Sequence, residues 1–109
     1  SEEAIKNAKE IQILEGKQKT ILRELYEGLR QYCEAIGYTK GYQFLDHESI
    51  TFFLEEVLKE ESISLKFDRY RKLRNGINYY GNELSLDTIK DALVEIPKII
   101  SVLKKYVTL

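Results

Sequence analysis

The chain has 109 residues, 43% of them hydrophobic and 32% charged, a balance that excludes an intrinsically disordered chain and predicts a single globular domain over residues 1–109. A net charge of −1 and a pI near 5.9 exclude a domain that holds nucleic acid by overall positive charge alone. One cysteine and one histidine allow neither an internal disulfide nor a His/Cys metal cluster, and no apolar run approaches the roughly 20 residues that span a bilayer.

Apolar residues recur every three or four positions along nearly the whole chain, and this period predicts helices. A first stripe covers residues 4–14, after which Gly16 in "EGK" either ends the helix or lies within one continuous helix. A wider stripe over residues 22–36 is typical of a core-facing helix. The sequence "GYTKGY" that follows predicts a loop bracketed by Gly37 and Gly41.

Three further helices follow in the second half of the chain. Asp46 can cap the third, and its predicted apolar face consists of Ile50, Phe53, Leu54, Val57 and Leu58. The fourth is predicted over residues 62–80 with Gly81 as its stop signal, and its stripe consists of Ile63, Phe67, Tyr70, Leu73, Ile77 and Tyr80. Ser85 can cap the fifth, whose stripe consists of Leu86, Ile89, Leu93, Ile96, Ile100, Leu103 and Val107.

No segment shows the alternation of a strand, so the sequence predicts an all-α, antiparallel bundle of four to five helices. The second, fourth and fifth helices carry the broadest stripes and should form its centre. A chain with one cysteine suits a reducing compartment, and we expect a cytoplasmic protein with no membrane partner, no metal and no other cofactor.

The stretch "RKLRNGINYYGN", residues 71–82, places polar and cationic side chains where the fourth helix should be apolar. On a wheel of about 100° per residue, Arg74 falls inside the apolar arc. Burying an arginine there is costly unless its charge is paired. Its guanidinium could reach solvent or an acid such as Glu55 or Glu56 from the edge of the arc. Alternatively, the arc faces a cleft in which Arg74 meets a phosphate or a dimer partner.

The sequence "LRNGINYYG" resembles the motif of HEPN domains (higher eukaryotes and prokaryotes nucleotide-binding), which are small helical bundles. That motif is an arginine followed by Asn or Asp, with a histidine a few residues later near a helix end. Arg74 and Asn75 match its opening pair, and the layout of helices over nearly the whole chain is also similar. Tyr79 or Tyr80 stands where the family has its histidine.

The resemblance implies a relation to toxin-type, metal-independent ribonucleases, in which the arginine steadies phosphate charge and the histidine transfers protons. Tyrosine titrates near pH ~10, against ~6.5 for histidine, and transfers protons poorly at neutral pH. We therefore expect an RNA- or nucleotide-binding domain with weakened or absent cleavage, in which Arg74, Asn75 and Tyr79 occupy the catalytic positions. The expected binding residues are Arg71, Asn78, Tyr80, Lys66 and Arg69.

HEPN domains pair about a two-fold axis with their motif helices facing, so the resemblance also implies a homodimer. Pairing would double a cationic patch made of Lys66, Arg69, Arg71, Lys72 and Arg74, and would let an acidic chain hold RNA. In some HEPN toxin–antitoxin systems a separately encoded nucleotidyltransferase adenylylates a tyrosine of the HEPN protein. In this chain the modified tyrosine would be Tyr80. The alternatives are a non-enzymatic helical interaction and dimerisation module, or a helper partner of such a nucleotidyltransferase.

Helix geometry sets further expectations for single residues. An unbroken helix directs Tyr79 about 140° away from Arg74, so the two converge only if the helix unwinds or two chains share one site. One of the two adjacent tyrosines should be exposed or lie at an interface. His47, directly before the third helix, is expected to help cap that helix rather than act as a remote catalytic base. Cys33 is expected to be a small buried hydrophobe.

Overall fold

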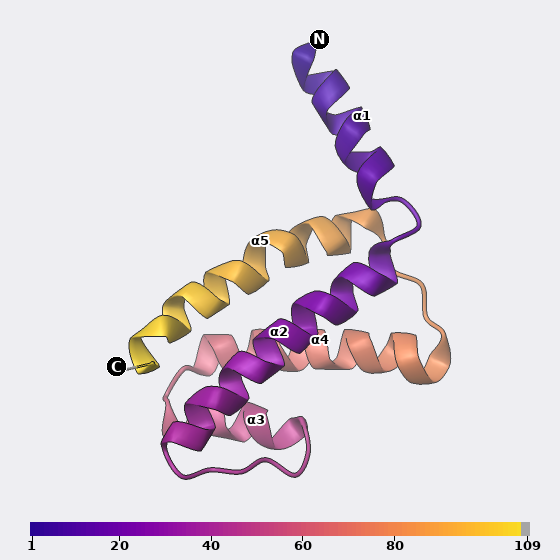
Figure 1. Ribbon diagram of the computed structural model, residues 1–109. Helices are drawn as coiled ribbons and strands as arrows, with labels where there is room; N and C mark the ends of the chain where they lie inside the picture. The colour runs from indigo at the N-terminus through magenta and orange to yellow at the C-terminus, as the bar shows by residue number, and fades with distance from the viewer. Residues whose placement is uncertain (108–109) are drawn as a thin grey trace.

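The computed structural model describes residues 1–107, and this part of the chain is helical and contains no strand. Five α-helices follow one another (Figure 1), with a π-helical segment after the third and a short 3₁₀ turn at the end. They are α1 Glu2–Leu14, α2 Gln18–Thr39, α3 Glu48–Phe52, η1 Phe53–Val57, α4 Glu61–Tyr80, α5 Leu86–Leu103 and η2 Lys104–Tyr106. The all-α prediction is therefore confirmed for these residues.

The bundle centre consists of α2, α4 and α5, as the apolar stripes predict. Both α2 and α5 run opposite to α4, so they run in the same general direction rather than antiparallel to each other (Figure 1). Two contacts between the helix ends agree with this arrangement. Lys19 at the start of α2 pairs with Glu83 just before α5 at 3.2 Å, and Tyr106 after α5 donates to the Leu58 carbonyl before α4 at 3.2 Å.

The helix α1 is separated from the bundle by a turn at Glu15–Lys17, where Gly16 adopts a φ of +78°. Because only glycine adopts such a φ without strain, the break at Gly16 replaces the continuous helix that the sequence also allowed. Beyond the turn, α1 projects away from the other helices (Figure 1) and buries none of its residues.

The helix α2 runs through Gly37 to Thr39, two residues further than the predicted loop boundary. Gly37 stays helical and is buried because the ring of Phe44 lies against it. A Cβ at this position would come within 2.4 Å of Phe44 Cε2. Glycine is therefore required here for close packing and not for a turn, whereas Gly41, with a φ of +86°, makes the turn.

The third helix is capped as predicted, because the backbone N–H of Ser49 donates to Asp46 Oδ1 at 2.8 Å. It then widens into a π-turn, in which the Leu58 N–H donates to the Phe53 carbonyl at 3.1 Å. The wider turn holds more residues than an α-turn and rotates the following side chains. For this reason Val57, predicted to be in the core, is 39% exposed, while Leu58 is buried.

The core contains side chains from every helix except α1, and the largest fully buried ones come from α2 and α4. Two predicted core positions of the fifth stripe, Leu93 and Val107, are instead 38% and 46% exposed. The buried face of α5 consists of Ile89, Ala92, Ile96, Ile99 and Leu103, which follows the three-and-four spacing more closely than the predicted stripe. Across residues 1–107, no helix has the length and apolar content of a membrane span.

Candidate functional site

The polar stretch at residues 71–82 ends α4 without unwinding it. Gly81 adopts the left-handed conformation with a φ of +64°, and its N–H donates to the Ile77 carbonyl at 3.2 Å. The Asn82 N–H donates to the Gly76 carbonyl at 3.1 Å, and the Asn82 side chain folds over Gly76. Both glycines therefore serve a helix C-cap. Because the helix is intact to Tyr80, Tyr79 does not approach Arg74 within one chain.

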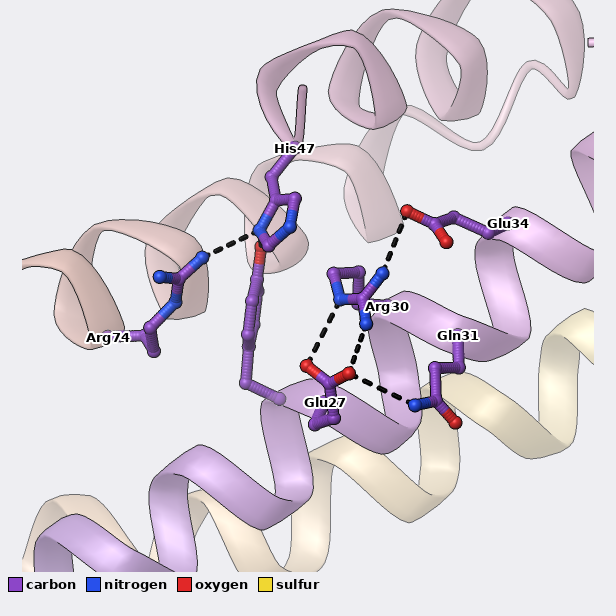
Figure 2. A network of polar contacts seen from close by, with 7 residues as sticks. Glu27, Arg30, Gln31, Glu34, His47 and Arg74 are labelled. Carbon is purple, nitrogen blue, oxygen red and sulfur yellow. Dashed lines mark hydrogen bonds and ion pairs between the residues drawn. The ribbon is translucent and has the colours of Figure 1, made fainter. Parts of the chain in front are cut away.

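Arg74 instead meets the histidine of the chain. Its Nη2 donates to His47 Nδ1 at 2.6 Å (Figure 2), and its guanidinium carbon lies 5.1 Å from the ring centroid of Tyr26. The Tyr26 hydroxyl lies 2.9 Å from the same nitrogen, His47 Nδ1. The expectation that His47 caps α3 is wrong, because its side chain makes no capping bond and Asp46 does so in its place. Nor does Arg74 pair with Glu55 or Glu56.

The contact with Arg74 fixes how His47 carries its proton. A guanidinium can only donate, so Nδ1 must accept, and the proton of the neutral imidazole lies on Nε2. Burial lowers the pKa of His47, and the positive charge of Arg74 lowers it further. Burial also raises the pKa of Tyr26 above its usual value of 10.0. At neutral pH the pair is therefore a neutral imidazole and a neutral phenol, both acting as hydrogen-bond donors.

A second cluster on the next turns of α2 holds Arg30 between two carboxylates. Arg30 pairs with Glu27 and, at 2.8 Å, with Glu34, and Gln31 donates to Glu27 at 3.0 Å (Figure 2). These contacts neutralise the guanidinium of Arg30. By contrast, no carboxylate within residues 1–107 forms an ion pair with Arg23 or Arg74.

These side chains line a groove of about 310 Å³ between α2, α4 and the start of α3. Its wall residues are Arg23, Glu24, Tyr26, Glu27, Arg30, His47, Arg74 and Asn78. Arg23 Nε donates to Asn78 Oδ1 at 2.9 Å, so the amide nitrogen of Asn78 keeps both its protons available. The groove thus gathers two cationic side chains without a carboxylate partner, the carboxylate of Glu24, and two neutral donors, the His47 Nε2–H and the Asn78 amide.

The other cationic residues proposed from the sequence do not join this groove. Lys66 and Arg69 face α5, where both approach Glu95, at 3.9 and 3.7 Å. Arg71 and Lys72 both pair with Asp68, at 2.8 and 3.0 Å. The expected patch is therefore divided among three different surroundings, and only Arg74 lies in the groove.

The remaining proposed residues lie near the end of α4. Asn75 is half-buried, and Asn78 belongs to the groove. Tyr79 and Tyr80 are 72% and 80% exposed, so both tyrosines point to solvent, although the sequence stripe placed Tyr80 in the core. They are the last two residues of α4.

Sequence reasoning missed Arg23, Tyr26, Arg30 and His47 as members of one site. A signal was present for α2, because residues 23, 26 and 30 recur at helical spacing and place polar groups beside the core stripe. No such signal existed for His47, whose ring reaches the groove from the loop before α3.

Comparison with protein-family models, curated proteins and solved structures gives no match for this chain.

Proposed function

We propose that the groove around Arg74 and His47 binds a phosphate group of RNA or of a nucleotide, in a HEPN-like domain that binds more readily than it cleaves. The observation that carries this proposal is the convergence of Arg23 and Arg74, both without a carboxylate partner, on two neutral donors. Such a set offers hydrogen bonds and positive charge to one anion.

Partial burial strengthens the argument for a phosphate. Arg74 lies over the Tyr26 ring and is not extended into water, and charge interactions are stronger at such partly desolvated positions. A phosphate oxygen competes well with a neutral imidazole for a guanidinium, because the phosphate adds an opposite charge that the imidazole lacks. An arriving phosphate would therefore take Arg74 from His47 and leave His47 Nδ1 bonded to the Tyr26 hydroxyl alone.

The same geometry favours binding over cleavage. Ribose cleavage needs a group that accepts the 2′-hydroxyl proton and another that donates to the leaving oxygen. In the groove, the Tyr26 hydroxyl stays hydrogen-bonded to His47 Nδ1 after a phosphate takes Arg74, and the raised pKa of Tyr26 makes it a poor base. Tyr79, which stands in the place of the family's histidine, lies outside the groove in solvent.

A homodimer remains part of the proposal. One groove holds few positive charges for a chain of net charge −1, and pairing would double them. Tyr80, which is 80% exposed, is also accessible to a separately encoded nucleotidyltransferase that would adenylylate it, as the resemblance to HEPN toxins implies.

The proposal is tested by titrating a fluorescent single-stranded RNA with the protein and with Arg74→Ala at several salt concentrations. Loss of one phosphate contact should weaken binding and reduce the salt slope by about 0.7. Lys98→Ala, which removes one positive charge from α5, serves as the control and should leave the slope unchanged. Gel analysis of the same RNA reports cleavage. Equal binding by the protein and by Arg74→Ala would refute the phosphate site.

A second candidate, a non-enzymatic interaction module, is favoured by the outer face of α4. Leu65, Tyr79 and Tyr80 are 69%, 72% and 80% exposed there. On a helix of about 100° per residue they fall within one arc of about 100°, on the side opposite Arg74. Sedimentation without RNA tests this candidate, because a partner face predicts a dimer that Leu65→Glu dissociates while Arg74→Ala does not.

A further inference from the structure

A second pocket lies at the end of α2, apart from the groove. The chain turns back after α2 so that the Tyr42 N–H donates to the Gly37 carbonyl at 2.9 Å. The Phe44 ring then lies directly against Gly37, as described above. The positive φ of Gly41 and the absence of a Cβ at Gly37 hold this loop in a defined shape. The pocket is therefore built by the fold of the loop.

Three aromatic rings line this pocket of about 430 Å³. Tyr42 and Phe44 pack at steep angles on the buried Phe53, with ring centroids 5.0 and 5.3 Å from it. Tyr38, from the last turn of α2, is 81% exposed and forms part of the wall. Within residues 1–107 neither tyrosine hydroxyl is hydrogen-bonded to another residue. The pocket thus presents aromatic rings, and the hydroxyl groups of its two tyrosines remain available to a ligand.

The polar groups around these rings include two acceptors, from Glu34 and Gln31. Glu34 lines the pocket, and only one of its carboxylate oxygens contacts Arg30 (Figure 2). Two carboxylates surround Arg30, so the cluster of Glu27, Arg30 and Glu34 has a net charge of −1. Gln31 uses its amide N–H on Glu27, which leaves its carbonyl oxygen as an acceptor. No lysine, arginine or histidine lines the pocket.

We propose that this pocket binds an organic cation, either an alkylammonium or a guanidinium group. Aromatic faces attract such cations through the negative potential above the ring, most strongly where water is partly excluded. A carboxylate with a free oxygen and a glutamine carbonyl supply the remaining attraction. The pocket shares no wall residue with the groove around Arg74, so this proposal stands whether or not the groove binds RNA.

The test follows backbone amide NMR signals of residues 31–44 during titration with choline. The neutral control is 3,3-dimethylbutan-1-ol, which has the shape of choline without its charge. Choline should shift these signals, and the alcohol should bind at least about two- to fivefold more weakly, the contribution expected of one exposed cation–π contact. Equal shifts with the alcohol, or no shift with choline at about 10 mM, would overturn the proposal.

Two variants locate the site. Tyr38→Ala, at a position too exposed to affect folding, should weaken choline binding about two- to fivefold, and Glu34→Gln should weaken it as well. Phe52→Ala removes an aromatic side chain that is 62% exposed outside this pocket and should change nothing. Unchanged binding by Tyr38→Ala would overturn the assignment.

Titration with N-acetyl-lysine methylamide, its trimethylated form and N-acetyl-arginine methylamide then identifies the preferred head group. A preference for any of these supports the cation class.

Discussion

Arg74 and His47 are 27 positions apart in the chain, yet Arg74 Nη2 lies 2.6 Å from His47 Nδ1. The contact joins α4 to the loop before α3 and sets the protonation state of the imidazole. It gives the Arg74 guanidinium one hydrogen-bond acceptor but leaves its positive charge without a carboxylate partner. The pKa of His47 therefore depends on whether Arg74 lies beside it, and the predictions for the groove follow from this dependence.

The lowered pKa of His47 predicts that stability depends on pH. In the unfolded chain His47 titrates near its ordinary value of about 6.5, so below that pH the unfolded state binds more protons than the folded state. The free energy of unfolding should be at its maximum above about pH 6.5 and should fall as the pH approaches 5. Urea unfolding across this range measures the effect. His47→Gln should flatten the profile, and an unchanged profile would contradict the assignment.

RNA binding should depend on pH in the opposite sense. Once a phosphate takes Arg74, His47 loses its contact with that cation and lies beside a negative charge, which favours the protonated imidazole. Affinity for a phosphodiester should therefore increase as the pH falls from about 7.5 to about 5.5. A phosphodiester backbone is suitable because it does not titrate in this range, whereas a phosphomonoester does, near pH ~6. At constant salt, His47→Gln should remove the slope.

Glu34 should oppose anion binding in the groove through Arg30. Glu34→Gln leaves Arg30 with Glu27 as its only ionic partner and makes the groove more positive. RNA affinity should increase about two- to fivefold at low salt and less at high salt. Glu2→Gln makes the same change of charge on α1, which projects away from the other helices (Figure 1) and contributes no wall residue to the groove. Equal increases in the two variants would mean that only net charge matters.

The helices could be predicted from the sequence because their signals are local. The expected start of the fourth helix was residue 62 and the observed start is Glu61, and Ser85 caps α5 by accepting the Thr88 N–H at 3.1 Å. The error at Val57 arose because a π-turn changes the period without changing the composition.

The site was less predictable because it is assembled from distant segments. Arg74 and Asn78 carried a visible signal, since polar residues interrupted an apolar stripe. His47 carried none, because its place depends on how the loop after Gly41 returns across α2. The resemblance to the HEPN motif predicted Tyr79, on the same helix as Arg74, as its partner. The residue that contacts Arg74 is His47, which comes from the loop before α3.

The buried thiol of Cys33 provides a probe of folding. Cys33 has no exposed surface, and burial raises the pKa of its thiol to about 12. The thiolate is the reactive form, so native protein at pH 8 should react with a thiol reagent only when it unfolds. The observed rate should rise with urea in parallel with unfolding measured by circular dichroism. Rapid reaction in the native state would show that the core around α2 opens locally.

Two glycines with opposite backbone requirements test the C-cap of α4. Gly81 has a φ of +64°, and an alanine there should lower the free energy of unfolding by roughly 1–2 kcal/mol. Gly28 lies within α2, where a Cβ would meet nothing within 4 Å, so Gly28→Ala should stabilise the protein by roughly 0.5–1 kcal/mol. Urea unfolding of the two variants under the same conditions compares one chemical change at two positions. If Gly81→Ala were neutral, α4 would not depend on the left-handed cap, and the exposure of Tyr79 and Tyr80 beside it would need another cause.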